Sequence, residues 1–134
     1  MRVENLLTRE PLGVYPETPI IEAARVMRDA TVRALAVCGC HGLVGILTAS
    51  DIVTRSVAEV SPLALVGSIM TPFPQSLTPS DSVESALALM DQHGIDHLPV
   101  VAGEDLLGLV TRAELSVITA RLPQLPRAGH LAPA

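Results

Sequence analysis

The chain repeats itself at an offset of 63 residues, and the match runs without a gap from about residue 6 to residue 58. Ten pairs of residues are identical across this offset, among them Gly45/Gly108 and Thr48/Thr111. Self-similarity of this kind usually means that one supersecondary unit is used twice, because each copy has an apolar face that it cannot bury alone. The chain is therefore expected to fold as two copies of one small unit.

Both copies predict the same order of elements, β-α-β-β-α, which makes the fold class α+β. An extended segment is followed by a helix whose apolar residues recur at i, i+3, i+4 and i+7. Two strands rich in small and β-branched residues then form a hairpin, and a second helix closes the unit. The first copy comprises Leu12–Tyr15, a helix opened by Thr18 and Pro19, Arg33–Cys38, Leu43–Leu47 and a helix from Thr48; the second comprises Gln75–Thr78, a helix opened by Asp81, Asp96–Val101, Leu106–Val110 and a helix from Thr111.

The repeat also sets the expected domain limits. Residues 1–60 are assigned to the first unit and 61–122 to the second. The remainder, 123–134, contains Pro123, Pro126 and Pro133 and is expected to be a disordered tail.

Composition excludes several classes of function. The net charge is −5, and the nine basic residues are all scattered arginines, so no basic patch for nucleic acid or for a membrane surface is evident. No apolar run approaches the roughly 18 residues that span a bilayer. The N-terminal residues lack the apolar core of a signal peptide. Together with two cysteines placed too close for a structural disulfide, this predicts a reducing, cytoplasmic location.

The second copy contains the run from Gly94 to Val101, Gly-Ile-Asp-His-Leu-Pro-Val-Val, and both copies end on a glycine, two apolar residues, Thr-x-x and an acid. These ending motifs are 45–51, Gly-Ile-Leu-Thr-Ala-Ser-Asp, and 108–114, Gly-Leu-Val-Thr-Arg-Ala-Glu. Found twice at one offset, they resemble the CBS domain family over nearly the whole chain outside the tail, and stand-alone proteins with two CBS domains in particular.

This resemblance implies a Bateman module, in which tandem CBS domains pack with pseudo-twofold symmetry and leave two clefts. Family members commonly bind AMP, ADP, ATP or S-adenosylmethionine in these clefts, and no cofactor is required. The modules often form homodimers, and a regulated protein partner is a further expectation from the resemblance.

The motif Thr48-x-x-Asp51 has two interpretations, which are compatible. It is a capping box, in which the Thr hydroxyl accepts a backbone N–H and the acid reaches back to the cap. The same Asp51 carboxylate has acceptor positions for both hydroxyls of a ribose, and Thr48 is placed to meet a phosphate. We expect an adenosine ligand at this first motif.

The second motif departs from the first because Glu114 replaces the aspartate. Glutamate caps a helix equally well, but its extra methylene moves the carboxylate by about one C–C bond, and ribose contact is sensitive to such a shift. A modified or vacant second cleft is therefore expected. Arg112, next to Thr111, is a candidate phosphate ligand for that cleft.

Further binding residues are expected around the first motif. Arg33 and His97 lie at the start of the strand after the first helix of each copy, where family members often contact phosphate; a solvated strand end is an equally good interpretation. The adenine is expected among four apolar or backbone positions, namely Leu12, Gly13, Val14 and Ile46.

The run Cys38-Gly39-Cys40-His41 suggests zinc, but a structural zinc site takes four ligands and the chain has no further cysteine. We interpret it as a hairpin turn, and a redox-sensing thiol pair stays open.

Two functions remain as alternatives. One is a regulatory module that binds an adenosine-containing ligand between the repeats, and the other is a ligand-free dimerisation or scaffold module. An enzyme is not expected, since no nucleophile–base–acid arrangement, glycine-rich phosphate loop or metal triad is present in the sequence.

Overall fold

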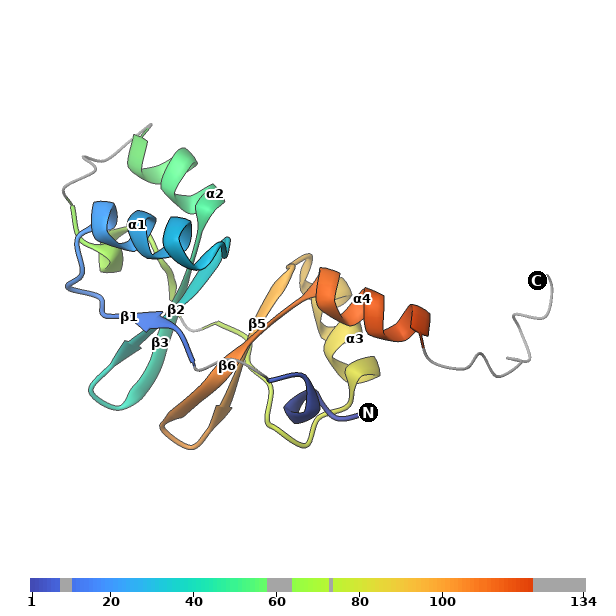
Figure 1. Cartoon of the computed structure of the whole chain (residues 1–134). Coiled ribbons are helices and arrows are strands. Elements are labelled where there is room, and N and C mark those ends of the chain that lie inside the picture. Colours follow the sequence, from blue (N-terminus) through green and yellow to red (C-terminus); the bar gives the residue numbers. More distant parts are fainter. Residues whose placement is uncertain (8–10, 58–63, 73, 122–134) are drawn as a thin grey trace.

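The computed structural model describes residues 1–7, 11–57, 64–72 and 74–121. The two repeats form two lobes, each with its own sheet and helices (Figure 1). The first lobe contains β1 (Gly13–Val14), α1 (Ile20–Ala30), β2 (Ala34–Gly39), β3 (Gly42–Thr48), α2 (Ala49–Asp51) and its continuation η2 (Ile52–Val57). The second contains α3 (Val83–His93), β5 (His97–Ala102), β6 (Asp105–Thr111) and α4 (Arg112–Arg121). The segments before each repeat hold η1 (Val3–Leu6), η3 (Val66–Ser68) and β4 (Thr71–Pro72).

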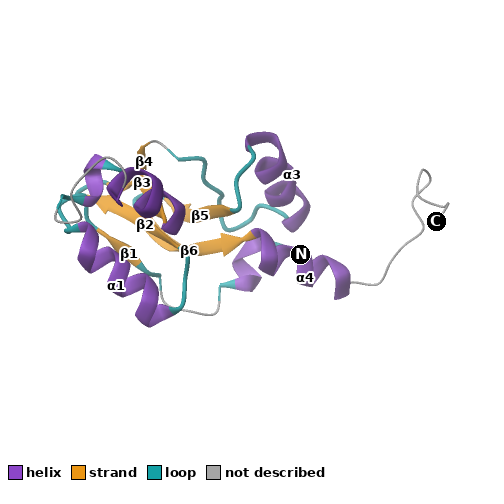
Figure 2. Ribbon diagram, turned by 90° about the horizontal axis from the view of Figure 1, so that it is seen from above, coloured by secondary structure: helices purple, strands orange, loops and turns teal. Residues whose placement is uncertain are grey.

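The predicted α+β fold of two β-α-β-β-α units is confirmed. β2 and β3 form an antiparallel hairpin with β1 parallel to β2, and β5 and β6 form the corresponding hairpin. In the second repeat the first strand is reduced to one parallel bridge, between Leu77 and Val100. Figure 2 shows the strands of both repeats side by side in the middle of the molecule, with α1 on one side of them and α3 and α4 on the other.

The predicted start of the first helix is wrong by one residue. α1 begins at Ile20 with Pro19 at its N-cap, and the Thr18 hydroxyl accepts the N–H of Tyr15 instead of capping the helix. Likewise, Ser82 rather than Asp81 caps α3, because the Ser82 hydroxyl accepts the N–H of Ser85 at 3.0 Å.

Both first helices end in the same way. The C-cap residues Thr31 and Gly94, which are 63 positions apart, have left-handed backbones with φ of 56° and 63°. The next N–H in each case reaches back five residues, from Val32 to the Met27 carbonyl and from Ile95 to the Met90 carbonyl, both at 3.0 Å. This geometry turns the chain sharply into β2 or β5.

Each lobe has an aliphatic core, and the segment that precedes a repeat completes the core of the other lobe. Val3 is fully buried in the second core, and Val66 is fully buried in the first. The Val3 N–H donates to the Asp81 carbonyl, and the Val66 N–H donates to the Thr18 carbonyl, both at 2.8 Å. The exchange is reciprocal, as expected when two repeats are related by an approximate twofold axis. Figure 1 shows the N-terminal turn beside α3 and α4.

The exchange also extends the first sheet, whose strand order is β1-β2-β3-β4. β4 pairs antiparallel with β3 through Gly45 and Pro72. In the part of the chain that the structure describes, no helix combines the length and apolar character needed to cross a bilayer. The limits 1–60 and 61–122 stay predictions, and the proposed tail 123–134 lies outside the described residues.

Candidate functional site

One large cavity, of about 1350 Å³, lies where the two lobes meet. Its lining combines the first turn after β3, the entry to β2, the start of α4 and the entry to β5. α1 and α2 stand on one side of this region and α3 and α4 on the other (Figure 1). The cavity exceeds the roughly 300–1,000 Å³ of an ordinary small-molecule site, so a nucleotide-sized ligand would leave part of it unfilled.

The first motif forms the capping box predicted from the sequence. The Thr48 Oγ1 accepts the Asp51 N–H at 3.1 Å, and the Asp51 Oδ2 accepts the Thr48 N–H at 3.0 Å. The Thr48 hydroxyl donates to no described residue, and the second carboxylate oxygen, Oδ1, lies 3.9 Å from Arg55 Nε. Thr48 lines the cavity, so its hydroxyl proton is available to a ligand.

The second motif forms an equivalent box with one additional bond. Glu114 Oε1 accepts both the Thr111 N–H at 3.0 Å and the Thr111 hydroxyl at 3.1 Å, while the Thr111 Oγ1 accepts the Glu114 N–H. The longer side chain of Glu114 thus engages the hydroxyl that its shorter counterpart leaves unused. Both Thr111 and Glu114 line the cavity.

Arg112 is tied to its own lobe. Its guanidinium donates to Asp91 at 2.7 Å, to Asp96 at 2.9 Å and to the Ile95 carbonyl at 3.1 Å. The hydrogen bonds to Asp91 and Asp96 raise the pKa of Arg112 above its ordinary value. The residue lines the cavity, but three of its five N–H donors are already engaged, which weakens its candidacy as a phosphate ligand.

Arg33 and His97 lie on the same cavity although they come from different repeats. Arg33 is exposed, and its guanidinium forms no ion pair with a described residue. His97 is half-buried, and burial lowers the pKa of its imidazole; Asp96 and Glu114 raise that pKa, whereas Arg33 lowers it further.

The structure therefore brings most of the predicted binding residues together on one surface. Seven of the eleven line the cavity: Leu12, Arg33, Thr48, His97, Thr111, Arg112 and Glu114. The other four, Gly13, Val14, Ile46 and Asp51, do not contribute to its lining. Val14 and Ile46 are buried in the first lobe, Gly13 pairs with Ala36 of β2, and the Asp51 side chain is 15% exposed beside the cap.

Several residues that line the cavity were not predicted from the sequence. Ser50, Val53 and Thr54 follow Thr48 on the same stretch of helix, and their i, i+3, i+4 spacing was an available signal. Leu6 and Leu7 also line the cavity, but they arrive through the exchanged N-terminal segment, for which no local pattern exists.

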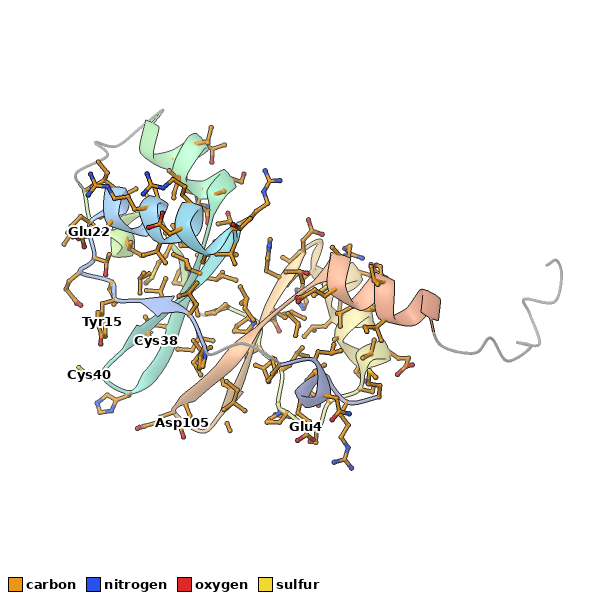
Figure 3. All side chains as sticks on the ribbon, in the orientation of Figure 1. Glu4, Tyr15, Glu22, Cys38, Cys40 and Asp105 are labelled. Atoms are coloured by element: carbon orange, nitrogen blue, oxygen red, sulfur yellow. The ribbon has the colours of Figure 1, made fainter. Side chains whose placement is uncertain are left out.

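The cysteine run forms the predicted hairpin turn between β2 and β3, as the position of Cys40 in Figure 3 shows. Cys38 is half-buried, Cys40 is exposed, and both are free thiols. Burial raises the pKa of the Cys38 thiol. His41 Nδ1 lies 3.9 Å from Glu104 Oε2 at the tip of the other hairpin. Within the described residues, no three His, Cys, Asp or Glu side chains are grouped as a metal site.

Comparison with known proteins places these features in a family. A family model described as CBS domain matches residues 3–58 and 66–118. The chain is 34% identical over 116 residues to the CBS domain-containing protein YhcV of Bacillus subtilis, a match that covers 86% of this chain and 83% of that protein. It is 36% identical over 115 residues to the inosine-5'-monophosphate dehydrogenase of Korarchaeum cryptofilum, covering 85% of this chain but only 23% of that protein.

A solved structure with the same fold carries adenosine compounds. The CBS domain pair of protein MJ0100, in complex with 5'-methylthioadenosine and S-adenosyl-L-methionine, superposes with a TM-score of 0.80. Sequence identity is 26%, and the match covers 89% of this chain and 99% of that chain.

Proposed function

The chain belongs to the CBS domain family, and from that premise we propose that it is a regulatory module whose cavity between the repeats binds an adenosine-containing ligand. The observation that carries the proposal is a cavity shared by both repeats and lined by two unused polar groups, the Arg33 guanidinium and the Thr48 hydroxyl. Unengaged donors on a concave surface are what a small polar ligand needs for its orientation.

The two motifs support one occupied cleft more strongly than two. The Thr48 hydroxyl has its proton free of described acceptors, whereas the Thr111 hydroxyl already donates to Glu114. Because a donor that is engaged internally must break a bond before it meets a ligand, the first motif is the better ligand site. The second motif then holds α4 in place, and the Arg112 bonds to Asp91 and Asp96 have the same effect.

In this proposal the phosphate lies near Arg33 and Thr48, and the ribose lies toward Asp51. The Asp51 Oδ2 is committed to the cap, so Oδ1 accepts the ribose hydroxyl. Because Asp51 does not line the cavity, the ligand must reach past Ser50, which does. Leu12 supplies an apolar contact for the adenine. Gly13, Val14 and Ile46 support this wall from behind rather than touch the base.

Ligand binding acts by favouring one arrangement of the two lobes, and coupling of this kind is typically worth about 1–3 kcal/mol. The readout is a homodimer or a regulated protein partner. Exposed apolar side chains support such an interface, because Tyr15 is 67% exposed, Val53 63% and Val117 48%. The module requires no cofactor and performs no catalysis. The free thiols of Cys38 and Cys40 support a cytoplasmic location.

A ligand screen by thermal unfolding tests the proposal. The purified chain is heated with AMP, ADP, ATP, NAD or S-adenosylmethionine at increasing concentrations up to a few millimolar. A ligand present at about 100 times its dissociation constant stabilises the folded protein by about 2.7 kcal/mol, which is easily measured as a rise in the unfolding temperature. If no compound raises that temperature, the ligand-free scaffold function is the better account.

Two matched variants locate the site by calorimetric titration of the ligand that the screen identifies. Thr48→Val removes the available hydroxyl and is expected to weaken binding by about tenfold, because a lost hydrogen bond to a charged group is worth about 1.5–3 kcal/mol. Thr111→Val removes the hydroxyl that is already engaged and is expected to leave the affinity within about twofold. Equal losses in both variants would contradict the single-site assignment.

A further inference from the structure

A second, smaller hollow of about 510 Å³ is formed by α4 and the N-terminal turn η1, which lie side by side in Figure 1. We call it the α4 groove. Its described lining consists of six residues: Asn5, Leu6, Ala113, Glu114, Val117 and Ile118. Glu114 is the single charged residue among these six. The volume lies within the roughly 300–1,000 Å³ of ordinary ligand sites, so the groove has room for a side chain from another molecule.

The repeat gives each groove residue a counterpart 63 positions away, and in the first lobe a side chain spans the counterparts. In the same order as above, they are Ser68, Ile69, Ser50, Asp51, Thr54 and Arg55. The Arg55 Nη1 donates to the Ile69 carbonyl at 3.3 Å, and the Arg55 Nε lies 3.9 Å from Asp51 Oδ1. The first lobe therefore shows what chemistry fits this position, namely an aliphatic stem that carries a guanidinium to a carboxylate and a backbone carbonyl.

The second lobe keeps the acceptors but lacks the arginine. Ile118 stands in place of Arg55, and its side chain is shorter and has no donor. Glu114 stands in place of Asp51, and Leu6 supplies the carbonyl that corresponds to that of Ile69. The Glu114 Oε1 is engaged by Thr111, but its Oε2 accepts from no described residue. A carboxylate oxygen thus lies beside an apolar groove, and no basic residue belongs to the described lining.

We propose that the α4 groove binds the side chain of an arginine presented by a protein partner, which supplies the guanidinium that the second repeat lacks. The stem of this arginine lies along Leu6, Val117 and Ile118, because arginine readily buries its methylene groups against apolar surface. Its guanidinium donates to Glu114 Oε2 and to the Leu6 carbonyl. Lysine fits less well, since its single ammonium cannot form the planar fork that matches a carboxylate.

The groove adjoins the large cavity. Leu6, Ala113 and Glu114 line both, so an arginine in the groove lies next to the second motif. The inference rests on the proposed function for the role of the partner and adds the chemical class of the group by which that partner is recognised. Because the two sites share Glu114, a ligand in the cavity and an arginine in the groove influence each other's binding.

The experiment is an NMR titration of the isotope-labelled full chain with a blocked tripeptide that has arginine between two alanines. The same tripeptide with lysine, and with citrulline as the neutral isostere of arginine, are the comparison ligands. The arginine peptide is expected to shift the amide signals of Leu6, Ala113 and Ile118 at millimolar concentrations. The citrulline peptide is expected to bind at least about tenfold more weakly, because its hydrogen bonds to Glu114 are no longer charge-assisted.

Three variants test the comparison between the lobes. Ile118→Arg supplies the guanidinium from the chain itself and is expected to abolish peptide binding, whereas Ile118→Leu keeps the groove and is expected to stay within about twofold of the wild type. Arg55→Ala empties the counterpart in the first lobe and is expected to create a second site, seen as new shifts at Ser68 and Ile69.

A further variant keeps the test valid if Ile118→Arg does not fold. Glu114→Gln retains an acceptor for the cap and removes the charge, and it is expected to weaken the arginine peptide about tenfold while leaving the citrulline peptide unaffected.

The outcomes separate this inference from the proposed function. No binding of the arginine peptide, equal affinity for the citrulline peptide, or undiminished binding by Ile118→Arg overturns the inference. Self-association that Ile118→Arg abolishes would assign the groove to a second copy, and binding that requires removal of residues 122–134 would assign it to this chain's own C-terminal segment; either result also overturns it. A rise in the unfolding temperature with an adenosine compound, without peptide binding, overturns this inference alone. Peptide binding without any adenosine response overturns the proposed ligand alone.

Discussion

The thioether of Met70 packs directly over Gly45, so closely that a Cβ added to Gly45 would lie 2.5 Å from the Met70 sulfur. Gly108 is the equivalent glycine, 63 positions after Gly45, and Leu7 packs over it in the same way. A Cβ added to Gly108 would lie 2.8 Å from the Leu7 Cδ2. Both covering side chains belong to the exchanged segments. The glycine of each repeated motif is therefore explained by the close packing of an exchanged segment onto the strand rather than by backbone conformation.

The first prediction concerns these two glycines. Gly45→Ala is expected to lower the free energy of unfolding by about 1–3 kcal/mol, since its Cβ also meets the Thr71 carbonyl oxygen at 3.0 Å and the paired strand cannot easily retreat. Gly108→Ala is expected to cost less, because only the end of the Leu7 side chain must move. Urea unfolding of both variants checks the order, and a larger loss for Gly108→Ala would contradict it.

The second prediction concerns Val3, which is buried in the core of the second lobe although it is the third residue of the sequence. Val3→Ala is expected to destabilise the protein by about 1–3 kcal/mol, because it removes two methyl groups from a packed core. Asn5→Ala, in the same turn but exposed, is expected to stay within about 0.5 kcal/mol of the wild type. Equal urea midpoints for both variants would show that the exchanged segment adds no stability.

The third prediction concerns the backbone of Thr31, a β-branched residue with a φ of 56°. This conformation destabilises a residue other than glycine by about 1–2 kcal/mol. Replacement by glycine removes this strain, but part of the gain is offset because glycine has more conformational freedom in the unfolded chain. Thr31→Gly is therefore expected to stabilise the protein by about 0.5–1 kcal/mol in urea unfolding.

The equivalent position supplies the control for Thr31. Gly94 has a φ of 63°, and an added Cβ there meets no atom within 4 Å, so only the backbone conformation opposes a side chain. Gly94→Thr is expected to destabilise the protein by about 1 kcal/mol or more. Opposite signs for the two variants are required, and a loss of stability in Thr31→Gly would contradict the argument.

The elements of this fold are predictable from sequence because their signals are local. The apolar stripes of α1 and α3, the hairpin turn at Cys40 and the capping boxes at Thr48 and Thr111 all depend on residues within a few positions of each other. The prediction that Glu114 can replace aspartate in the cap also rests on neighbouring residues only. The hydrogen bond that Glu114 accepts from the Thr111 N–H confirms this prediction.

What sequence could not supply is the pairing of distant segments. Nothing local assigns Val3 to the second core, and nothing near Arg112 in the chain reveals that its partner Asp91 precedes it by 21 residues. The relation of Asp51 to the cavity was beyond reach for a similar reason. The motif fixes its place at the cap, but the side of the helix that meets the other lobe depends on how the two lobes pack.

The last prediction is the pH dependence of stability without ligand. Burial and Arg33 lower the pKa of His97 in the folded protein, whereas in the unfolded chain the pKa is about 6.5. As the pH falls below that value, the unfolded chain binds the proton first, so the free energy of unfolding decreases. The stabilisation from a neutral His97 is complete above about pH 6.5 and is lost as the pH falls through the lower pKa of the folded state.

The control is His93→Gln, a matched change in an exposed histidine of α3. In urea unfolding at pH 7.5, 6.5 and 5.5, the wild type and His93→Gln are expected to lose more stability than His97→Gln, whose side chain does not titrate. Parallel curves for the three proteins would mean that His97 is solvated as freely in the folded protein as in the unfolded chain.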